Sequence, residues 1–382
     1  MELNEILAVA VKALGSDIHL KTGLPPVVRI DGALRPIPNA PRLAAEDMQR
    51  IAYGIMSDKQ RKTFEEKLEL DLSYSVTGLG RFRVSVFLQR GSVGMVLRSI
   101  PFNIPSFEGL HLPEALKKLA LEERGLILVT GTTGSGKSTT LASMINYINE
   151  NRTCNIITVE DPVEYLHRDR KSIISQREIG FDTLSFANAL RGALRQDPDV
   201  ILVGEMRDME TIEIALTAAE TGHLVLSTLH TLDATETVNR IIGVFPPHQQ
   251  RQIRIQLAAV IKGVVSQRLM PQASGKGRVP AVELLIATSR IRECIDDEDK
   301  TKLIHDAIAQ GFISYGMQTF DQSLMSLYTR QLITYEEALR QSSNPDDFAL
   351  KVSGIASTSD STWDKFVAEE EEEHEQVPIE KF

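Results

Sequence analysis

A short glycine-rich turn between an apolar stretch and a helical stretch constrains this chain more than any other feature of it. Residues 126–130 have the continuous apolar character of a buried strand, and a helix is expected from Lys137 to about Asn149. The turn between them, Gly131 to Ser138, matches the pattern GxxxxGKS/T. Glycines supply positive φ angles here, which lets backbone N–H groups wrap around a phosphate. The pattern predicts a site for ATP or GTP; the alternative, a chance match, is disfavoured by the flanking strand and helix.

The first turn of the following helix is expected to complete this phosphate site. A helix N-terminus carries about half a positive charge, and the Lys137 ammonium group is expected to reach the β- and γ-phosphates. The Ser138 hydroxyl is expected to bind Mg²⁺. The residues predicted to contact the nucleotide here are Thr132, Thr133, Gly134, Ser135, Gly136, Lys137, Ser138 and Thr139.

The acidic charge of the chain is concentrated at its C-terminal end. Residues 346–382 hold 11 acidic and 3 basic residues, and so carry most of the net charge of −10. The nearly neutral body offers no general electrostatic reason to bind nucleic acid. Only two cysteines occur, Cys154 and Cys294, which excludes a disulfide framework and argues against a structural zinc site. Without a signal-peptide pattern or an apolar run near ~18 residues, the chain is expected in the cytosol, reaching a membrane only through a partner.

Two domains are expected from the 382 residues. Residues 1–100 predict an α+β domain, with a helix over 2–14, a hairpin over 27–37, a second helix over about 43–67, and strands near 70–77, 81–89 and 93–100. Residues 101–110 are expected to be a linker, because Pro101 to Phe107 fits neither helical nor strand periodicity.

The strand–helix alternation that follows predicts a mostly parallel sheet covered by helices. It continues to about residue 285, and a helical pattern then runs from about 290 to 343, so residues 111–345 are expected to form the second domain. Residues 346–382 are expected to be a disordered acidic tail, with a run of five glutamates at 369–373. Trp363 in that tail is either a docking residue or part of an unstructured segment.

Two strand ends carry acidic residues that suit hydrolysis of a nucleotide. Glu205 follows the apolar run 200–203, where a carboxylate holds the water shell of a metal or polarises the attacking water. Glu160, Asp161 and Glu164 follow the run 156–159, and close carboxylates repel unless a cation or water stabilises them. Glu164 is the first candidate for general base and Glu160 the second. The alternative is that these acids lie on a solvated turn.

Histidines and arginines supply further candidates. His223 precedes the strand at 224–227 and His230 follows it, so both are expected to sense the γ-phosphate unless they are structural histidines. Arginines on the N-terminal strands either face solvent or are inserted by a neighbouring subunit to neutralise charge on the γ-phosphoryl group. These N-terminal candidates are Arg81, Arg83 and Arg98, and those around the Glu205 strand and beyond it are Arg195, Arg207 and Arg278.

Six spaced motifs together resemble the type II/IV secretion ATPases, and most closely the PilT/PilU branch associated with type IV pilus retraction and twitching motility. The motifs are Gly131–Thr139, Thr158–Glu164, Leu194–Val200, Val203–Asp208, Glu220–His223 and Thr228–Thr231. The resemblance implies an N-terminal PAS-like domain joined to a RecA-like P-loop ATPase domain with C-terminal helices, assembled as a homohexamer. It also implies ATP and Mg²⁺ as ligands, Ser138 and Glu205 at the metal, and Glu164 and Glu205 acting on water. It implies that His223 and His230 sense the phosphate, which Arg81, Arg83 and Arg98 approach from the N-terminal domain.

One segment departs from the retraction motors. They carry Ala-Ile-Arg-Asn-Leu-Ile-Arg-Glu where this chain has 289–297, so Arg292 is kept but the second basic position is Asp296. This departure at Asp296 resembles the accessory PilU members more than the retraction motors. The segment Phe320-Asp321-Gln322, residues 335–340 and the acidic tail resemble them in the same way. The partners implied are other copies of the chain, the inner-membrane platform protein of the pilus and a paralogous retraction ATPase, without nucleic acid or direct membrane insertion. The alternatives to a retraction motor are a pilus-assembly or type II secretion ATPase, a RecA-like nucleic-acid translocase, and a nucleotide-binding scaffold without turnover.

Overall fold

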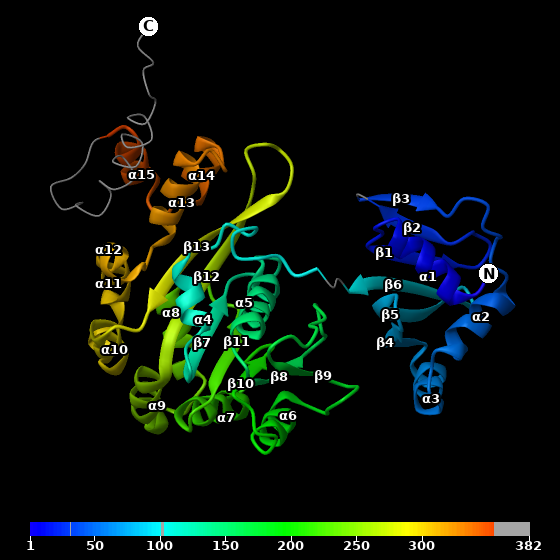
Figure 1. The fold of residues 1–382 in the computed structure, drawn as a ribbon, viewed down its shortest axis with the longest axis horizontal. Helices are drawn as coiled ribbons and strands as arrows, with labels where there is room; N and C mark the ends of the chain where they lie inside the picture. The colour runs from blue at the N-terminus through cyan, green and yellow to red at the C-terminus, as the bar shows by residue number, and fades with distance from the viewer. Residues whose placement is uncertain (31, 101–102, 355–382) are drawn as a thin grey trace, which may run out of the picture. The chain divides into compact units, whose positions relative to one another are not determined.

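The protein, analysed as a computed structural model, is described over residues 1–30, 32–100 and 103–354 (Figure 1). It divides into two compact units. The first comprises Met1–Asn103 with Glu164–Leu166, and the second comprises Ile104–Val163 and the described residues from His167 to residue 354. Each unit has a sheet and a hydrophobic core of its own, which confirms the expected combination of an α+β part and an α/β part.

The described residues of the first unit form an antiparallel six-stranded sheet in the order β3-β2-β1-β6-β5-β4. The hairpin and the three later strands are confirmed, although Asp31 of the hairpin turn lies outside the described residues. The elements are α1 (Leu3–Lys12), β1 (Asp17–Lys21), β2 (Val27–Ile30), β3 (Ala33–Pro36), α2 (Ala45–Gly54), α3 (Asp58–Lys67), β4 (Glu69–Val76), β5 (Gly80–Gln89) and β6 (Ser92–Ile100).

Two features of this unit differ from the sequence expectation. The single helix expected over 43–67 is two helices, because Ser57 starts a new one. Its hydroxyl accepts the Gln60 N–H, and the Gln60 side chain accepts the Ser57 N–H at 2.9 Å, forming a capping box. The strand β1 is additional, and it lies in the middle of the sheet between β2 and β6.

The described residues of the second unit form a seven-stranded sheet in the order β13-β12-β7-β11-β10-β8-β9. All pairs are parallel except β12 with β13. The strands and the helices between them are α4 (Ala115–Ala120), β7 (Gly125–Thr130), α5 (Lys137–Asn151), β8 (Asn155–Glu160), β9 (Ile173–Glu178), α6 (Phe186–Ala193), β10 (Val200–Val203), α7 (Met209–Glu220), β11 (Leu224–Leu229), α8 (Ala234–Gly243), α9 (Pro247–Val260), β12 (Ile261–Pro271) and β13 (Arg278–Ile286). The C-terminal helices are α10 (Ser289–Asp296), the 3₁₀ helix η1 (Glu298–Leu303), α11 (Ile304–Gln310), α12 (Phe312–Tyr315), α13 (Phe320–Thr329), α14 (Tyr335–Gln341) and α15 (Pro345–Val352).

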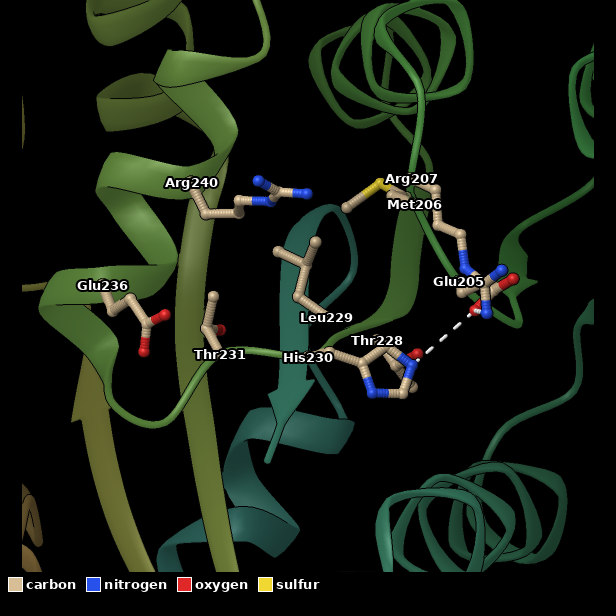
Figure 2. A pocket seen from close by; sticks show the side chains of 9 residues that line it. All are labelled: Glu205, Met206, Arg207, Thr228, Leu229, His230, Thr231, Glu236 and Arg240. Carbon is tan, nitrogen blue, oxygen red and sulfur yellow. Dashed lines mark ion pairs between the residues drawn. The ribbon is translucent and has the colours of Figure 1, made fainter. Parts of the chain in front are cut away.

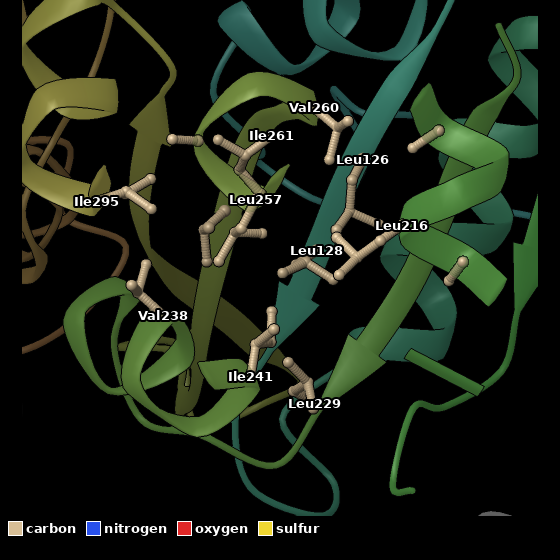
Figure 3. Packing of buried hydrophobic residues seen from close by; sticks show 14 of the residues in the cluster. Leu126, Leu128, Leu216, Leu229, Val238, Ile241, Leu257, Val260, Ile261 and Ile295 are labelled. Atoms are coloured by element: carbon tan, nitrogen blue, oxygen red, sulfur yellow. The ribbon is translucent and has the colours of Figure 1, made fainter. Parts of the chain in front are cut away.

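Apolar side chains of the interior strand β7 point alternately to the two faces of this sheet. Leu126 and Leu128 pack with Leu216 of α7 and Leu257 of α9 on one face (Figure 3). Residues 127 and 129 pack against α4 and α5 on the other face. Because both faces are covered, the strands read as continuous apolar runs, and the parallel strand ends are left as the edge where a ligand can reach the backbone.

Both ends of this unit extend beyond the boundaries expected from the sequence. Phe107, expected in a linker, is 3% exposed, and its ring lies 5.3 Å from that of Tyr147 between centroids. At the C-terminal end, residues 345–352 form α15, whose Phe348 is 1% exposed in a cluster with Leu324 and Ala338. Burial of one aromatic side chain therefore holds each of these segments to the domain. Pro101, Phe102 and residues 355–382, including Trp363 and the glutamate run, lie outside the described residues.

A buried arginine joins α9 to the C-terminal helices. The Arg254 side chain, 8% exposed, donates from Nη1 to the Ile295 carbonyl at 3.1 Å and to Thr301 Oγ1 at 3.0 Å. Replacing Arg254 with methionine keeps most of the buried stem but leaves both oxygens without this donor. We expect the free energy of unfolding to fall by about 2 kcal/mol, as measured by chemical denaturation.

Arg251 supplies the control for this prediction, because it is exposed on the same helix α9. The Arg251→Met variant should unfold at the denaturant concentration of the wild type. Equal stability of the two variants would contradict the role assigned to Arg254.

Candidate nucleotide-hydrolysis site

The glycine-rich turn has the backbone conformation that its sequence predicts. It joins β7 to α5, with φ angles of 140° at Gly131, 80° at Gly134 and 96° at Gly136. A Cβ on Gly131 would lie 2.5 Å from Ser135 Oγ and 2.5 Å from the Gln267 carbonyl oxygen. Both the backbone angle and the lack of space therefore require glycine at position 131.

Lys137 closes the turn on itself. Its side chain is 8% exposed, and its Nζ donates to the carbonyl oxygens of Gly131 at 2.8 Å and Thr132 at 2.9 Å. Within the described residues, the Ser135 hydroxyl is buried without a hydrogen-bond partner. An ammonium group, a spare hydroxyl and the N-terminus of the 15-residue helix α5 thus converge on one turn. These groups fit a bound polyphosphate, and Ser138, the second residue of α5, fits its Mg²⁺.

The strand register places His230 beside this turn. Thr130, the last residue of β7, is paired with Leu229, the last residue of β11. Gly131 directly follows β7 and His230 directly follows β11, so both residues leave the sheet at the same edge. The neighbouring strand β10 ends at Val203 on that edge, which also brings Glu205 there, as the sequence predicts.

Glu205 is the centre of a small charged cluster. Its Oε2 lies 2.8 Å from Arg207 Nη2 and 3.8 Å from His230 Nε2, as Figure 2 shows for the histidine contact. The pKa of His230 is lowered, first by burial and then by the positive charge of Lys137, and the Glu205 carboxylate only partly offsets this. His230 is therefore neutral at pH 7, and one of its ring nitrogens can donate a hydrogen bond while the other accepts.

A cavity of about 320 Å³ opens next to Glu205 and His230. Helix α8 forms one wall, and Arg240 of this helix extends toward Met206 across the cavity (Figure 2). The Glu236 carboxylate on the same helix accepts the Leu232 N–H at 2.7 Å. The lining residues are Glu205, Met206, Arg207, Thr228, Leu229, His230, Thr231, Glu236 and Arg240.

The second acidic cluster is spread over different environments. Glu160 at the end of β8 accepts hydrogen bonds from Thr158 Oγ1 at 2.6 Å and Gln176 Nε2 at 3.2 Å. Asp161 is exposed, and Glu164 is exposed and belongs to the first unit. The role of Glu164 or Glu160 as the general base stays a prediction.

The structure does not bring His223 to the phosphate turn of its own chain. His223 precedes β11, and its carbonyl accepts the N–H of Gly125, the first residue of β7. It thus lies at the opposite end of the strand from His230, and its Nδ1 lies 2.9 Å from the Ala218 carbonyl oxygen. Arg195 precedes β10 and lies at that same far edge. Arg278 is exposed and starts β13, where it is paired with Pro271 of β12. Pro271 lies five residues along β12 from Ser266, the residue paired with Thr130, so Arg278 is distant from the phosphate turn along the sheet.

The three N-terminal arginines belong to the first unit. Arg98 on β6 donates to Asp17 on β1 at 2.8 Å, which lowers the pKa of that carboxyl against the opposing effect of burial. Arg83 on β5 is exposed, and Arg81 on the same strand is partly buried. Their approach to a nucleotide stays a prediction.

Three polar residues near the turn were not found from the sequence. Gln267 on β12 is 1% exposed, and its Nε2 donates to Thr140 Oγ1 on α5 at 2.8 Å. Ser266 beside it and Glu283 on β13 are 0% and 3% exposed. Glu283 interrupts the apolar run 279–285, and Ser266 and Gln267 follow the apolar pair Val264-Val265; these breaks are the signal that could have identified them.

Comparison with known proteins identifies relatives over nearly the whole chain. The family model "Type II/IV secretion system protein" matches residues 1–340. The chain is 48% identical to the Pseudomonas aeruginosa protein named "Type IV pilus retractation ATPase PilT", over 91% of this chain and 100% of that protein. It is 44% identical to the P. aeruginosa "Type IV pilus ATPase PilU", over 94% and 93% of the two chains. A crystal structure of the pilus retraction motor PilT with bound ADP matches with a TM-score of 0.83 and 51% identity, over 91% of this chain and 98% of that one. No helix in the described ranges combines the length and apolar character that crossing a bilayer requires.

Proposed function

This chain belongs to the type II/IV secretion ATPase family, within it to the PilT/PilU pilus retraction ATPases, and we propose that it is a motor that hydrolyses Mg²⁺-bound ATP to withdraw a type IV pilus. The observation that carries the proposal is the shared edge of three parallel strands. At that edge lie the Lys137 turn, the Glu205 carboxylate and the neutral His230 imidazole. Glu205 contacts His230, and the charge of Lys137 lowers the pKa of His230.

Binding of ATP in this site would use groups that are already in place. The N–H groups of the turn and of the first turn of α5 surround the phosphates. Lys137, now bonded to the carbonyls of Gly131 and Thr132, exchanges these neutral acceptors for phosphate oxygens. Ser138 and Glu205 would hold Mg²⁺ with its water shell, and the metal supplies charge neutralisation at the phosphates.

Hydrolysis requires a positioned water next to the γ-phosphate. Glu205 is held by Arg207 at 2.8 Å and faces His230, so a water bonded between the carboxylate and the imidazole has a fixed orientation. Neutral His230 can donate to a phosphate oxygen without placing another charge beside Lys137. Glu164 as the general base, with Glu160 as the second candidate, belongs to this proposal and is not tested by the contacts above.

The assembly and partners are proposed from the family. We propose that the chain acts as a homohexamer in the cytoplasm, held at the inner membrane through the platform protein of the pilus and a paralogous retraction ATPase. Arg81, Arg83 and Arg98 would then meet the nucleotide of a neighbouring copy. The segment 289–297, which forms α10 and its C-cap, is where an accessory PilU-like role would differ from an autonomous one.

Genetic complementation tests this function. Deleting the gene is expected to leave cells hyperpiliated and unable to twitch, because pili extend but are not withdrawn. The wild-type gene should restore twitching, and Lys137→Ala should not. Repeating the assay with and without a paralogous ATPase gene separates an autonomous motor from an accessory one. Restoration of twitching by Lys137→Ala to the wild-type level in the absence of any paralogue would overturn the proposal.

A further inference from the structure

Thr228 on β11 contacts the backbone on both sides of Glu205. Its Oγ1 donates to the Gly204 carbonyl oxygen at 2.6 Å, and its own carbonyl oxygen accepts the Met206 N–H at 3.2 Å. These two groups belong to the peptide bonds that precede and follow Glu205. Because each hydrogen bond restrains one planar peptide group, the two together restrain both backbone torsions of Glu205. We call this pair of hydrogen bonds the Thr228 clamp.

The Thr228 clamp acts where the regular pairing of the strands has stopped. β10 pairs with β11 up to Val203, which lies opposite Ser227. The next residue is held from its other side by β8, since the Gly204 N–H donates to the Val159 carbonyl oxygen at 2.7 Å. A Cβ on Gly204 would lie 3.2 Å from that same oxygen, so the chain passes close against β8 here. Hydrogen bonds from β8 and β11 therefore fix the backbone at Glu205 from two sides.

The ion pair of the Glu205 side chain restrains this residue less than the clamp does. The side chain of Arg207 is 72% exposed, and water screens an ion pair to so exposed a group, which leaves it weak. Thr228 is instead only 6% exposed, and water competes little for a hydrogen bond in such a place. Arg207 can therefore orient the carboxylate, but the position of the residue that carries it depends on the clamp.

We propose that Thr228 is a positioning residue for ATP hydrolysis, which keeps the Glu205 carboxylate beside the phosphate turn by fixing the peptide groups on either side of it. This inference rests on the proposed function of the site. Thr228 acts through Glu205, since its hydroxyl group is already engaged with the Gly204 carbonyl. Without this hydroxyl the segment 204–206 can shift, and a misplacement of about 1 Å at a reacting group can cost about 100-fold in rate.

Two substitutions separate the hydroxyl group from the shape of the side chain. Thr228→Val keeps the β-branched shape that suits a strand but has no donor, whereas Thr228→Ser keeps the donor. For the purified full chain with Mg²⁺ and ATP, Thr228→Val should lower kcat by about tenfold. Its KM for ATP should stay within about twofold of the wild type, because the phosphate turn is unchanged. Thr228→Ser should keep kcat within about twofold of the wild type.

Ser227 provides the matched control, because its buried hydroxyl makes the same kind of hydrogen bond one residue earlier. Its Oγ donates to the Val203 carbonyl oxygen at 2.7 Å, and Val203 belongs to β10 and does not adjoin Glu205. Ser227→Ala should lower the free energy of unfolding, as Thr228→Val should, but keep the kcat of the wild type. A fall in kcat as large for Ser227→Ala as for Thr228→Val would overturn the inference, because the loss of any buried hydrogen bond of the sheet would then suffice.

Amide hydrogen exchange gives a readout that needs no turnover. The Met206 N–H should exchange faster in Thr228→Val than in the wild type, because the Gly204 carbonyl no longer restrains the segment. If Thr228→Val does not fold, Thr228→Ala removes the same donor from a residue that lines the cavity, where a smaller side chain leaves no closed void (Figure 2). Wild-type kcat in the variant that folds, or unchanged exchange of the Met206 N–H, would overturn the inference. Absence of hydrolysis by the wild type, with the exchange difference present, would instead refute the proposed function.

Discussion

Replacing Lys137 with alanine is expected to weaken ATP binding by about 100-fold or more, equivalent to about 3 kcal/mol. The Lys137 ammonium group is almost fully buried against the carbonyls of Gly131 and Thr132, so its charge is little screened by water. Without it, the turn presents only neutral N–H groups to a polyanion. Calorimetric titration with Mg²⁺ and ATP measures the loss.

Lys118 on α4 is the matched control for this change, because it is exposed and lies outside the phosphate turn. The Lys118→Ala variant should bind ATP like the wild type. An affinity of Lys137→Ala within a factor of about two of the wild type would show that the turn does not bind phosphate in the way proposed.

Replacing Glu205 with glutamine is expected to leave ATP binding within a few-fold of the wild type and to lower kcat by about 10²-fold or more. Glutamine fills the same space but cannot hold the metal and its water as a carboxylate does. The contact with Arg207 would lose its charge assistance, so the orientation of the group would also loosen. Steady-state phosphate release, together with nucleotide titration, separates the two effects.

The Glu213→Gln variant on α7 serves as the control, because it removes one exposed carboxylate from the same domain. Its kcat should match that of the wild type. If Glu205→Gln turned over ATP at the wild-type rate, the carboxylate at the end of β10 would have no part in the chemistry.

Local patterns predicted the phosphate turn, because its φ angles depend on glycine alone at Gly131, Gly134 and Gly136. The same was true of Glu205, since a residue just after an apolar parallel strand lies at the ligand edge of a sheet. His223 shows the limit of this reasoning. It also adjoins an apolar strand, but it precedes the strand, and the direction of the chain places it at the far edge.

Features that depend on distant pairs were not accessible from one sequence. Strand β1 begins with Asp17, whose carboxylate is stabilised by Arg98 on β6, 81 positions later. The pairing of Ser266 on β12 with Thr130 on β7 and with Glu283 on β13 depends on the register of the three strands, so these residues become neighbours only in the folded sheet. Phe107 and Phe348 are buried, so the domain includes part of the segment predicted as a linker and part of the segment predicted as a tail.

Phosphate release by the purified full chain supplied with ATP, with and without Mg²⁺, tests most directly whether this site hydrolyses nucleotide. The account predicts steady release that stops when Mg²⁺ is chelated, is absent from Lys137→Ala and persists in Lys118→Ala. Release that is indifferent to both chelation and Lys137→Ala, or no release from the wild type with Mg²⁺ present, would contradict it.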